Sequence, residues 1–259
     1  MRIGVIGAGG RMGREVCRAV TAADGLELVA AVDPHHAGRS VAEVAGVDAA
    51  LEIAADREAL LDAQVEVAVD FSLPDVVGAN LRWLLEHDVH AVVGATGLGD
   101  EDLVVAGELA SAGAANALIA PNFALGAVLL MRFAAEAARH LPHVEVIESH
   151  HDRKVDAPSG TALRTAELIA QARAEVPEAP VGDDDHPGAR GATHEDVRIH
   201  SVRLPGVVAD QDVIFGGLGQ TLTVSHRTLD RTAFMPGVLL ACRGVGDLDG
   251  LVVGLEHLL

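Results

Sequence analysis

Lys154 is the only lysine among the 19 basic side chains of this 259-residue sequence, and the other 18 are arginines. It lies in the segment ESHHDRKVDAPSGT, residues 148–161, four residues after His150. A lysine ammonium can release a proton in a pocket, whereas an arginine guanidinium stays charged. Histidine titrates near neutral pH. These residue types at this spacing predict that the segment is an active site.

The same segment offers a binding site for an anionic substrate. Ser159, Gly160 and Thr161 follow a proline and open a predicted helix, where free backbone N–H groups can bind a carboxylate. The alternative is that Ser159 is only an N-cap. His151 could complete the site, be satisfied structurally, or bind metal. We expect no metal, because no third ligand stands at a recognisable spacing.

A glycine-rich turn near the N-terminus predicts a dinucleotide site. Residues 7–13 lie between a predicted strand and a predicted helix, and their glycines allow close approach of a pyrophosphate to the helix N-terminus. Asp33, about 20 residues further on, ends the next strand, where a carboxylate would bind the ribose of NAD. The alternative is that Asp33 caps the following turn. A carboxylate at position 33 repels a 2′-phosphate and so favours NADH. Use of NADPH is the alternative, because Arg11, His35 and His36 lie close in the sequence and could accept its 2′-phosphate. The predicted cofactor-binding residues of this turn are Gly7, Ala8, Gly9, Gly10, Arg11, Met12 and Gly13, together with Asp33.

Two further turns follow predicted strands and belong to the same expected cofactor site. The ligand site of an open α/β sheet lies at the carboxyl ends of its strands. Ordinary strand-to-helix turns are the alternative for each. The candidate residues are Gly94, Ala95 and Thr96 in the first turn, and Ala120, Pro121, Asn122 and Phe123 in the second.

The apolar pattern predicts two domains. Before residue 124, strands at 2–6, 26–32, 65–71, 90–93 and 117–120 alternate with helices at 14–22, 74–87 and 100–111. This alternation indicates an α/β fold with a Rossmann-like, doubly wound parallel sheet. After it, helices at 126–140 and 159–174 and strands at 144–148, 197–204, 207–215 and 221–226 predict an α+β domain with a mostly antiparallel or mixed sheet.

The chain then returns to the first domain. A helix over 231–245 and a strand over 251–255 are expected to complete it, so the dinucleotide-binding domain spans 1–124 and 231–259 and the substrate domain spans 125–230. Residues 175–196, rich in proline, glycine and aspartate, predict a surface loop that includes Asp183–Asp185.

Composition limits the partners. A formal charge of −19 argues against nucleic acid, which is bound by neutralising phosphates. No apolar run reaches the roughly 20 residues that cross a bilayer, and the N-terminus lacks the layout of a signal peptide. Cys17 and Cys242 have no partners at metal-ligand spacing, so we expect a cytoplasmic protein. The acidity favours solubility, with salt adaptation and a genome-wide bias as alternatives.

Together these segments resemble the dihydrodipicolinate reductase family over nearly the whole chain. The resemblance rests on residues 5–13, 69–72, 94–97, 120–123 and 148–161, and on 229–237. The most specific part is His-His-x-x-Lys-x-Asp-x-Pro-Ser-Gly-Thr. Ala95 departs from the family, which usually has threonine there.

The resemblance implies hydride transfer from NADH or NADPH to a small cyclic dicarboxylate, giving tetrahydrodipicolinate in diaminopimelate and lysine biosynthesis. It implies that His150 is the acid/base, Lys154 the proton donor and His151 a substrate-binding residue, with Gly160 and Thr161 on a substrate carboxylate. It also implies a homotetramer built through the second domain's sheet, and hinge closure between the domains.

Two rival hypotheses remain at this point. One is an NAD-dependent dehydrogenase of another hydroxy or amino acid, with His150 as base and no need for Lys154. The other is a nucleotide-sensing regulatory protein that uses only the first domain and leaves the His-His-x-x-Lys segment without a role.

Overall fold

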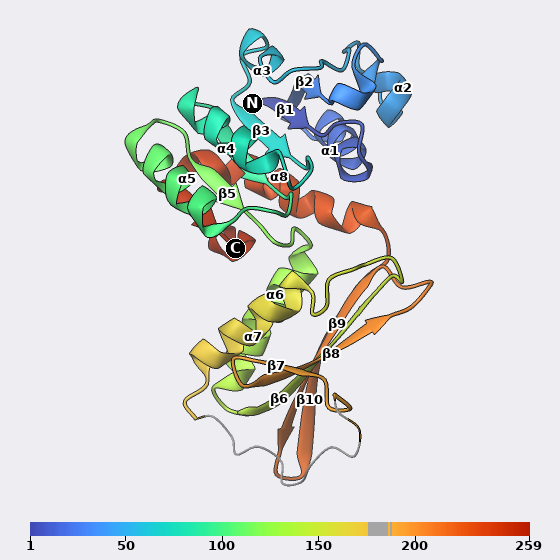
Figure 1. The fold of residues 1–259 in the computed structure, drawn as a ribbon, viewed down its shortest axis with the longest axis vertical. Coiled ribbons are helices and arrows are strands. Elements are labelled where there is room, and N and C mark those ends of the chain that lie inside the picture. Colours follow the sequence, from blue (N-terminus) through green and yellow to red (C-terminus); the bar gives the residue numbers. More distant parts are fainter. Residues whose placement is uncertain (176–185, 187) are drawn as a thin grey trace. The chain divides into compact units, whose positions relative to one another are not determined.

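The computed structural model describes residues 1–175, 186 and 188–259. This part of the chain forms two compact units, one made of Met1–Phe123 and Phe234–Leu259 and the other of Ala124–Ala233 (Figure 1). None of the helices in the described residues is long and apolar enough to span a membrane.

The first unit is built on a six-stranded sheet with the order β11-β5-β4-β3-β1-β2. Every pairing in it is parallel. The winding reverses between β1 and β3, which makes their carboxyl ends the expected ligand crevice. The strands are β1 (Arg2–Ile6), β2 (Glu27–Val32), β3 (Val67–Asp70), β4 (His90–Val93), β5 (Ala117–Ile119) and β11 (Leu251–Val253).

Parallel strands are buried on both faces of their sheet, so this sheet needs helices to cover it. All four residues of β3 are buried. Helix α4 packs against α5, and α1 packs against α8. The helices are α1 (Arg11–Ala22), α2 (Val41–Ala45), α3 (Ala59–Asp62), α4 (Val77–Glu86), α5 (Asp100–Ala112) and α8 (Met235–Gly244), with short 3₁₀ helices at Pro34–His36, Val245–Asp247 and Leu255–Leu258. A further 3₁₀ helix, Arg231–Phe234, spans the point where the chain passes from the second unit back to the first.

The second unit holds a five-stranded sheet with the order β10-β9-β6-β8-β7. Its β6 and β8 are parallel and its other neighbours are antiparallel. Helices α6 (Leu125–Ala138) and α7 (Gly160–Ala172) pack against each other and against the sheet. The strands are β6 (His143–His150), β7 (Ala192–His194), β8 (Val197–Arg203), β9 (Ala209–Gly217) and β10 (Gln220–Thr228).

The predicted fold class is confirmed, and several elements differ from the prediction in detail. Helix α1 begins at Arg11 rather than Arg14, because Gly13 lies within its first turn. Strand β7 lies in the predicted loop over 175–196; it is short and largely exposed, so it carries no apolar alternation. The rest of that loop includes Asp183–Asp185, which lie outside the described residues. The sequence analysis also missed the short helices α2 and α3.

Candidate active site

The His-His-x-x-Lys segment begins at the end of strand β6. This strand ends at His150, and the N–H of Lys154 then donates to the carbonyl of His151 (3.1 Å) in a turn. Side chains alternate along a strand, so Glu148 and His150 point to the same face. That face is buried at Glu148, which is 0% exposed. The strand therefore brings a buried carboxylate beside the first histidine.

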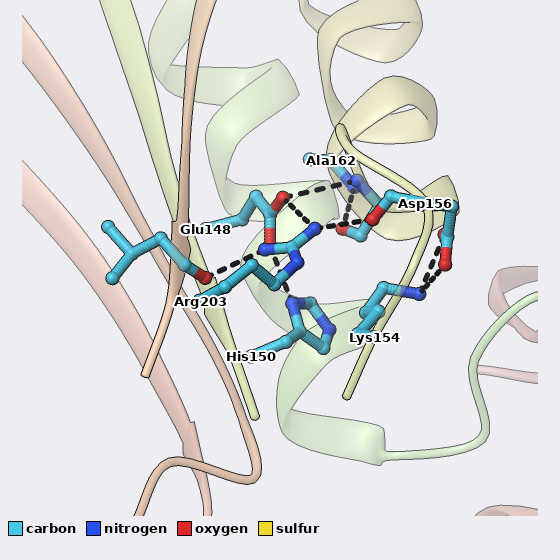
Figure 2. A network of polar contacts seen from close by, with 8 residues as sticks. Glu148, His150, Lys154, Asp156, Ala162 and Arg203 are labelled. Carbon is cyan, nitrogen blue, oxygen red and sulfur yellow. Dashed lines mark hydrogen bonds and ion pairs between the residues drawn. The ribbon is translucent and has the colours of Figure 1, made fainter. Parts of the chain in front are cut away.

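Glu148 is held by two cationic or titratable neighbours (Figure 2). Its Oε2 lies 2.5 Å from His150 Nδ1, and the guanidinium of Arg203 donates to both carboxylate oxygens at 2.9 Å. Burial on its own would raise the pKa of Glu148, but hydrogen bonds from His150, Arg203 and Ser201 lower that pKa to about 2. Glu148 is therefore ionised at neutral pH.

Arg203 also holds the loop that carries Lys154. It ends strand β8 and faces His150 in the parallel register of β6 and β8. Its Nη2 donates to the carbonyl of Asp156 at 2.6 Å, while the N–H of Ser159 donates to Glu148 Oε1 at 3.3 Å. The ion pair thus connects two strands to both ends of the 156–159 stretch.

Lys154 is paired with a carboxylate of its own loop. Its Nζ donates to both oxygens of Asp156, at 2.8 and 2.7 Å (Figure 2). Burial opposes ionisation of Asp156, but the hydrogen bond and the charge of Lys154 lower the pKa of Asp156. The Lys154 side chain is 23% exposed and that of Asp156 62% exposed, so the pair lies at the surface of the unit.

The N-terminus of α7 lies beside this cluster. The hydroxyl of Ser159 accepts from the N–H of Ala162 (3.2 Å), so the capping role left open above is present. Gly160 is exposed, and a Cβ built on it would meet nothing within 4 Å. Among the described residues His151 Nδ1 is buried and has no hydrogen-bond partner. A free imidazole nitrogen and an open helix start are features that a carboxylate ligand would satisfy.

The glycine-rich turn joins β1 to α1 in the first unit. Gly7 adopts a left-handed conformation (φ +76°), and a Cβ on Gly13 would overlap the Gly7 carbonyl oxygen. Gly10 caps α1 without any side-chain bond to the first N–H groups. The turn therefore needs its glycines, and it presents a helix N-terminus suited to a phosphate.

Asp33 fastens this turn to the end of β2. Its carboxylate accepts from the N–H groups of Gly9 (2.9 Å) and His35 (3.0 Å), and lies 3.1 Å from His36 Nδ1. Burial opposes ionisation, but the bonds from His36, Gly9 and His35 lower the pKa of Asp33. Asp33 thus caps the 3₁₀ helix Pro34–His36, which is the capping role that the sequence offered as the alternative to ribose binding. A carboxylate has about four acceptor positions, so one remains for a ligand.

A hollow of about 420 Å³ opens at the carboxyl ends of β1, β2 and β3. It lies where the winding of the sheet reverses, which is the usual ligand site of such folds. The residues that line it are Ile6, Gly7, Val32, Asp33, Pro34, His35, Ala55, Asp56, Arg57, Glu58, Ser72, Leu73, Val76 and Asn80.

The other two predicted turns follow β4 and β5, neighbours in the same sheet. A Cβ on Gly94 would overlap the ring of Phe71, whose ring centroid is 5.8 Å from that of Phe123. Phe123 and Ala120 are buried, and the methyl group of Ala95 packs against the apolar core. At these three positions, contacts to a ligand would come from the backbone. Thr96 and Pro121 are exposed.

No group of three or more His, Cys, Asp or Glu in the described residues has an arrangement that could hold a metal ion.

Comparison with known proteins decides the family. Models for the N-terminal and C-terminal parts of dihydrodipicolinate reductase match residues 1–123 and 126–259. The chain belongs to the dihydrodipicolinate reductase family. The resemblance found in the sequence is therefore confirmed.

Curated relatives of this reductase match it from end to end. A 4-hydroxy-tetrahydrodipicolinate reductase of Nocardia farcinica is 51% identical and covers 100% of this chain and 98% of its own length. One from Moorella thermoacetica is 47% identical, with 100% and 98% covered. A solved dipicolinate-bound dihydrodipicolinate reductase from Paenisporosarcina sp. TG-14 is 39% identical, covers 100% and 99%, and gives a TM-score of 0.86.

More distant structures share the fold alone. An amine dehydrogenase from Mycobacterium smegmatis is 14% identical with a TM-score of 0.69, over 99% of this chain and 95% of that one. At that identity the likeness carries no argument for a dehydrogenase activity.

Sequence reasoning missed three polar residues of this reductase. Glu148 stands two residues before His150, and that spacing alone places both on one face of a strand. Arg203 is 55 residues away from Glu148, so only the register of β6 and β8 reveals it. Asp156 lies within the signature, and its spacing from Lys154 gave no sign of the ion pair.

Proposed function

We propose that this chain reduces 4-hydroxy-tetrahydrodipicolinate to tetrahydrodipicolinate with NADH or NADPH, in diaminopimelate and lysine biosynthesis. The observation that carries the proposal is end-to-end identity of 45–51% with several reductases of that name. The chemistry of the second unit supports it, because His150, His151, Lys154 and the start of α7 lie within one short stretch of chain. The rival sensor hypothesis leaves this stretch without a role.

The substrate side of the proposal rests on charge. A dicarboxylate ligand needs cations and hydrogen-bond donors, which this unit offers in the ammonium of Lys154, the unpartnered His151 Nδ1 and the exposed Gly160 at the start of α7. Gly160 and Thr161 would hold one carboxylate through their backbone N–H groups. Ser159 would act mainly by capping the helix that presents them.

The cofactor side rests on the glycine turn and the hollow beside it. Residues 7–13 would hold the pyrophosphate, and the turns at 94–96 and 120–123 would complete the site. The carboxylate of Asp33, with one acceptor position left, would take a ribose hydroxyl and repel a 2′-phosphate. We therefore propose NADH as the better of the two cofactors.

When bound, the cofactor supplies the hydride. The protein places the substrate and moves a proton, because hydride addition to a conjugated system needs a proton at another position of the molecule. Lys154 would donate that proton from Nζ, and His150 would act as acid/base through Nε2, since its Nδ1 faces Glu148. From the hydroxylated substrate one hydride and one proton are consumed and water leaves.

The proposal includes a homotetramer built through the second unit's sheet. Helices α6 and α7 pack against this sheet, whereas every residue from Gln220 to Thr223 in strand β10 is exposed. The exposed part of β10 is therefore available for contacts between subunits. Sedimentation velocity would measure the oligomer, and a monomer at micromolar concentration would contradict this part. A cytoplasmic location is also proposed, because Cys17 and Cys242 are both free and buried.

The direct test follows the loss of NADH or NADPH absorbance while a dihydrodipicolinate synthase generates substrate from pyruvate and aspartate semialdehyde. Turnover is expected, with a fall in kcat of about 100-fold or more for Lys154→Ala. Arg153→Ala, an exposed neighbour on the same loop, is the matched control and should leave kcat near that of the wild type. No oxidation of either cofactor by a protein that binds one would overturn the assignment.

A further inference from the structure

His150 is the only one of the two adjacent histidines that the structure provides with a buried carboxylate partner among the described residues. Its Nδ1 lies 2.5 Å from Oε2 of Glu148, a side chain with 0% exposure. His151, one residue on, has a buried Nδ1 with no partner in the same part of the chain. A carboxylate can only accept a hydrogen bond, so the proton between the two groups belongs to His150 Nδ1 when His150 is neutral.

Arg203 fixes the orientation of the Glu148 carboxylate. It donates to Oε2 and Oε1 of Glu148 at 2.9 Å each, and its planar fork fixes the plane of the carboxylate. A further hydrogen bond, from Nη2 to the Asp156 carbonyl at 2.6 Å, holds the loop that carries Lys154. One buried ion pair is therefore connected to both proposed catalytic groups.

We propose that Glu148 and Arg203 are positioning residues for the reduction: Glu148 holds His150 with its proton on Nδ1 and Nε2 free to exchange a proton with the substrate, and Arg203 fixes Glu148 and the Lys154 loop. The inference rests on the proposed function for its kinetic consequence. Its structural consequence, the tautomer of His150, does not depend on the substrate.

Glu148→Gln tests the effect of the carboxylate on the His150 tautomer, because it keeps the shape of the side chain. Oε1 of Glu148 accepts from two groups that can only donate, Arg203 Nη2 and the Ser159 N–H, so the amide oxygen should take that position. The amide NH₂ then takes the Oε2 position beside His150, and the bond from Arg203 Nη1 is lost. His150 Nδ1 must then accept, and its proton moves to Nε2. The variant therefore reverses the tautomer while keeping a hydrogen bond between residue 148 and His150.

The chain supplies a matched control on the same two strands. Glu145 of β6 bonds His200 of β8 through Nε2 at 2.8 Å, and the odd spacing from Glu148 places it on the opposite, solvent-facing side. Its side chain is 51% exposed. Glu145→Gln removes a carboxylate from a Glu–His pair without touching the proposed site.

The experiment compares the wild type, Glu148→Gln and Glu145→Gln as full chains. The ¹⁵N shifts of the His150 ring, assigned by their loss in His150→Gln, report the tautomer at a pH where the ring is neutral. We expect an Nδ1 proton in the wild type and Glu145→Gln, and an Nε2 proton in Glu148→Gln. Turnover in Glu148→Gln should fall about 10-fold to 100-fold in kcat with little change in the substrate KM. Glu145→Gln should match the wild type.

An unchanged tautomer in Glu148→Gln, or a kcat within about twofold of the wild type, would overturn the inference. If Glu148→Gln does not fold, Arg203→Lys provides the second variant: it keeps the charge but loses the fork, and should lower kcat while the His150 proton stays on Nδ1. A wild-type kcat in Arg203→Lys would equally overturn it. If the wild type itself fails to turn over, the proposed function fails, whereas the tautomer comparison still decides the positioning role.

Discussion

The ammonium of Lys154 donates to both carboxylate oxygens of Asp156, two residues further along the chain, at 2.8 and 2.7 Å. The proposed proton donor is therefore already paired, and the pKa of Asp156 is lowered by that pairing against the opposing effect of burial. An exposed pair of this kind is worth little, about 0.2–1 kcal/mol. A substrate carboxylate can compete for the same ammonium.

Asp156→Asn should therefore change the substrate affinity. Removal of the competing carboxylate should lower the substrate KM by about twofold to fivefold, because the Lys154 ammonium no longer has a charged partner in its own loop. Initial rates at pH 7 over a range of substrate concentrations measure KM and kcat. Asp152→Asn, exposed on the same loop, should leave KM unchanged, and an unchanged KM in Asp156→Asn would count against Lys154 as a contact of the substrate.

Arg203→Met should strongly destabilise the second unit. It leaves the buried Glu148 carboxylate without its cation, and loss of one partner of a buried pair costs about 3–5 kcal/mol. Urea unfolding followed by circular dichroism at pH 7 measures the change. Arg227→Met removes an exposed partner of Asp212 (2.8 Å) and should cost less than about 1 kcal/mol. Equal losses for the two variants would contradict the role assigned to Glu148.

The pair of Glu148 and Arg203 also predicts how the stability of the protein changes as the pH falls. The pKa of Glu148 is lowered from 4.5 to about 2 in the folded protein, so the unfolded chain binds more protons between these values. The stabilisation, about 3 kcal/mol by linkage, is fully present above pH 4.5 and is lost as the pH falls towards 2. Urea midpoints between pH 2 and 6 should show this slope in the wild type and a shallower one in Glu148→Gln. A slope of the same steepness in both proteins would be inconsistent with it.

The sequence predicted the first unit well because its signals are local. Apolar runs with glycine turns between them identified all six parallel strands, and the interval from Gly13 to Asp33 matched the βαβ spacing. The start of α1 was placed three residues late, since a glycine run resembles a loop even where Gly13 lies inside the helix. The His-His-x-x-Lys segment was found because unusual residue types gather within one short stretch.

The second unit shows what local pattern leaves out. The parallel pairing of β6 with β8 brings Arg203 to Glu148 across 55 residues, and no periodicity encodes which strands become neighbours. Strand β7 is exposed and only three residues long, so no apolar alternation marks it. Position 33 had two compatible interpretations, and only the geometry shows that the carboxylate caps the turn while keeping an acceptor position.

Gly13→Ala should disrupt the turn that we assign to the cofactor. The added Cβ would overlap the Gly7 carbonyl oxygen, a backbone atom that cannot move without shifting the turn. We expect NADH binding to weaken about 10-fold or more and the first unit to lose about 1–3 kcal/mol. NADH fluorescence titration measures binding, and Trp83, the sole tryptophan, reports unfolding of this unit.

Gly107→Ala is the control for this substitution. Gly107 lies within α5, and a Cβ there would approach only Leu251, at 3.9 Å. A helix interior favours alanine over glycine by about 1 kcal/mol, so stability should rise slightly and binding should not change. Wild-type NADH affinity in Gly13→Ala would remove the glycine turn from the proposed cofactor site.

Asp33→Asn should move the preference from NADH towards NADPH. The substitution removes the negative charge that would repel a 2′-phosphate, while the amide oxygen can still accept from Gly9 or His35. Part of the hold on the glycine turn is lost, so kcat/KM should fall with NADH and fall less, or rise, with NADPH. We expect the ratio of the two kcat/KM values to change by about 10-fold, corresponding to about 1.4 kcal/mol of differential binding. Asp56→Asn, which alters another carboxylate lining the same hollow, is the control for a general charge effect. If both substitutions change the ratio of the two kcat/KM values equally, the overall charge of the hollow determines the cofactor preference. If neither changes it, Asp33 only fastens the turn, and the cofactor preference comes from residues elsewhere in the first unit.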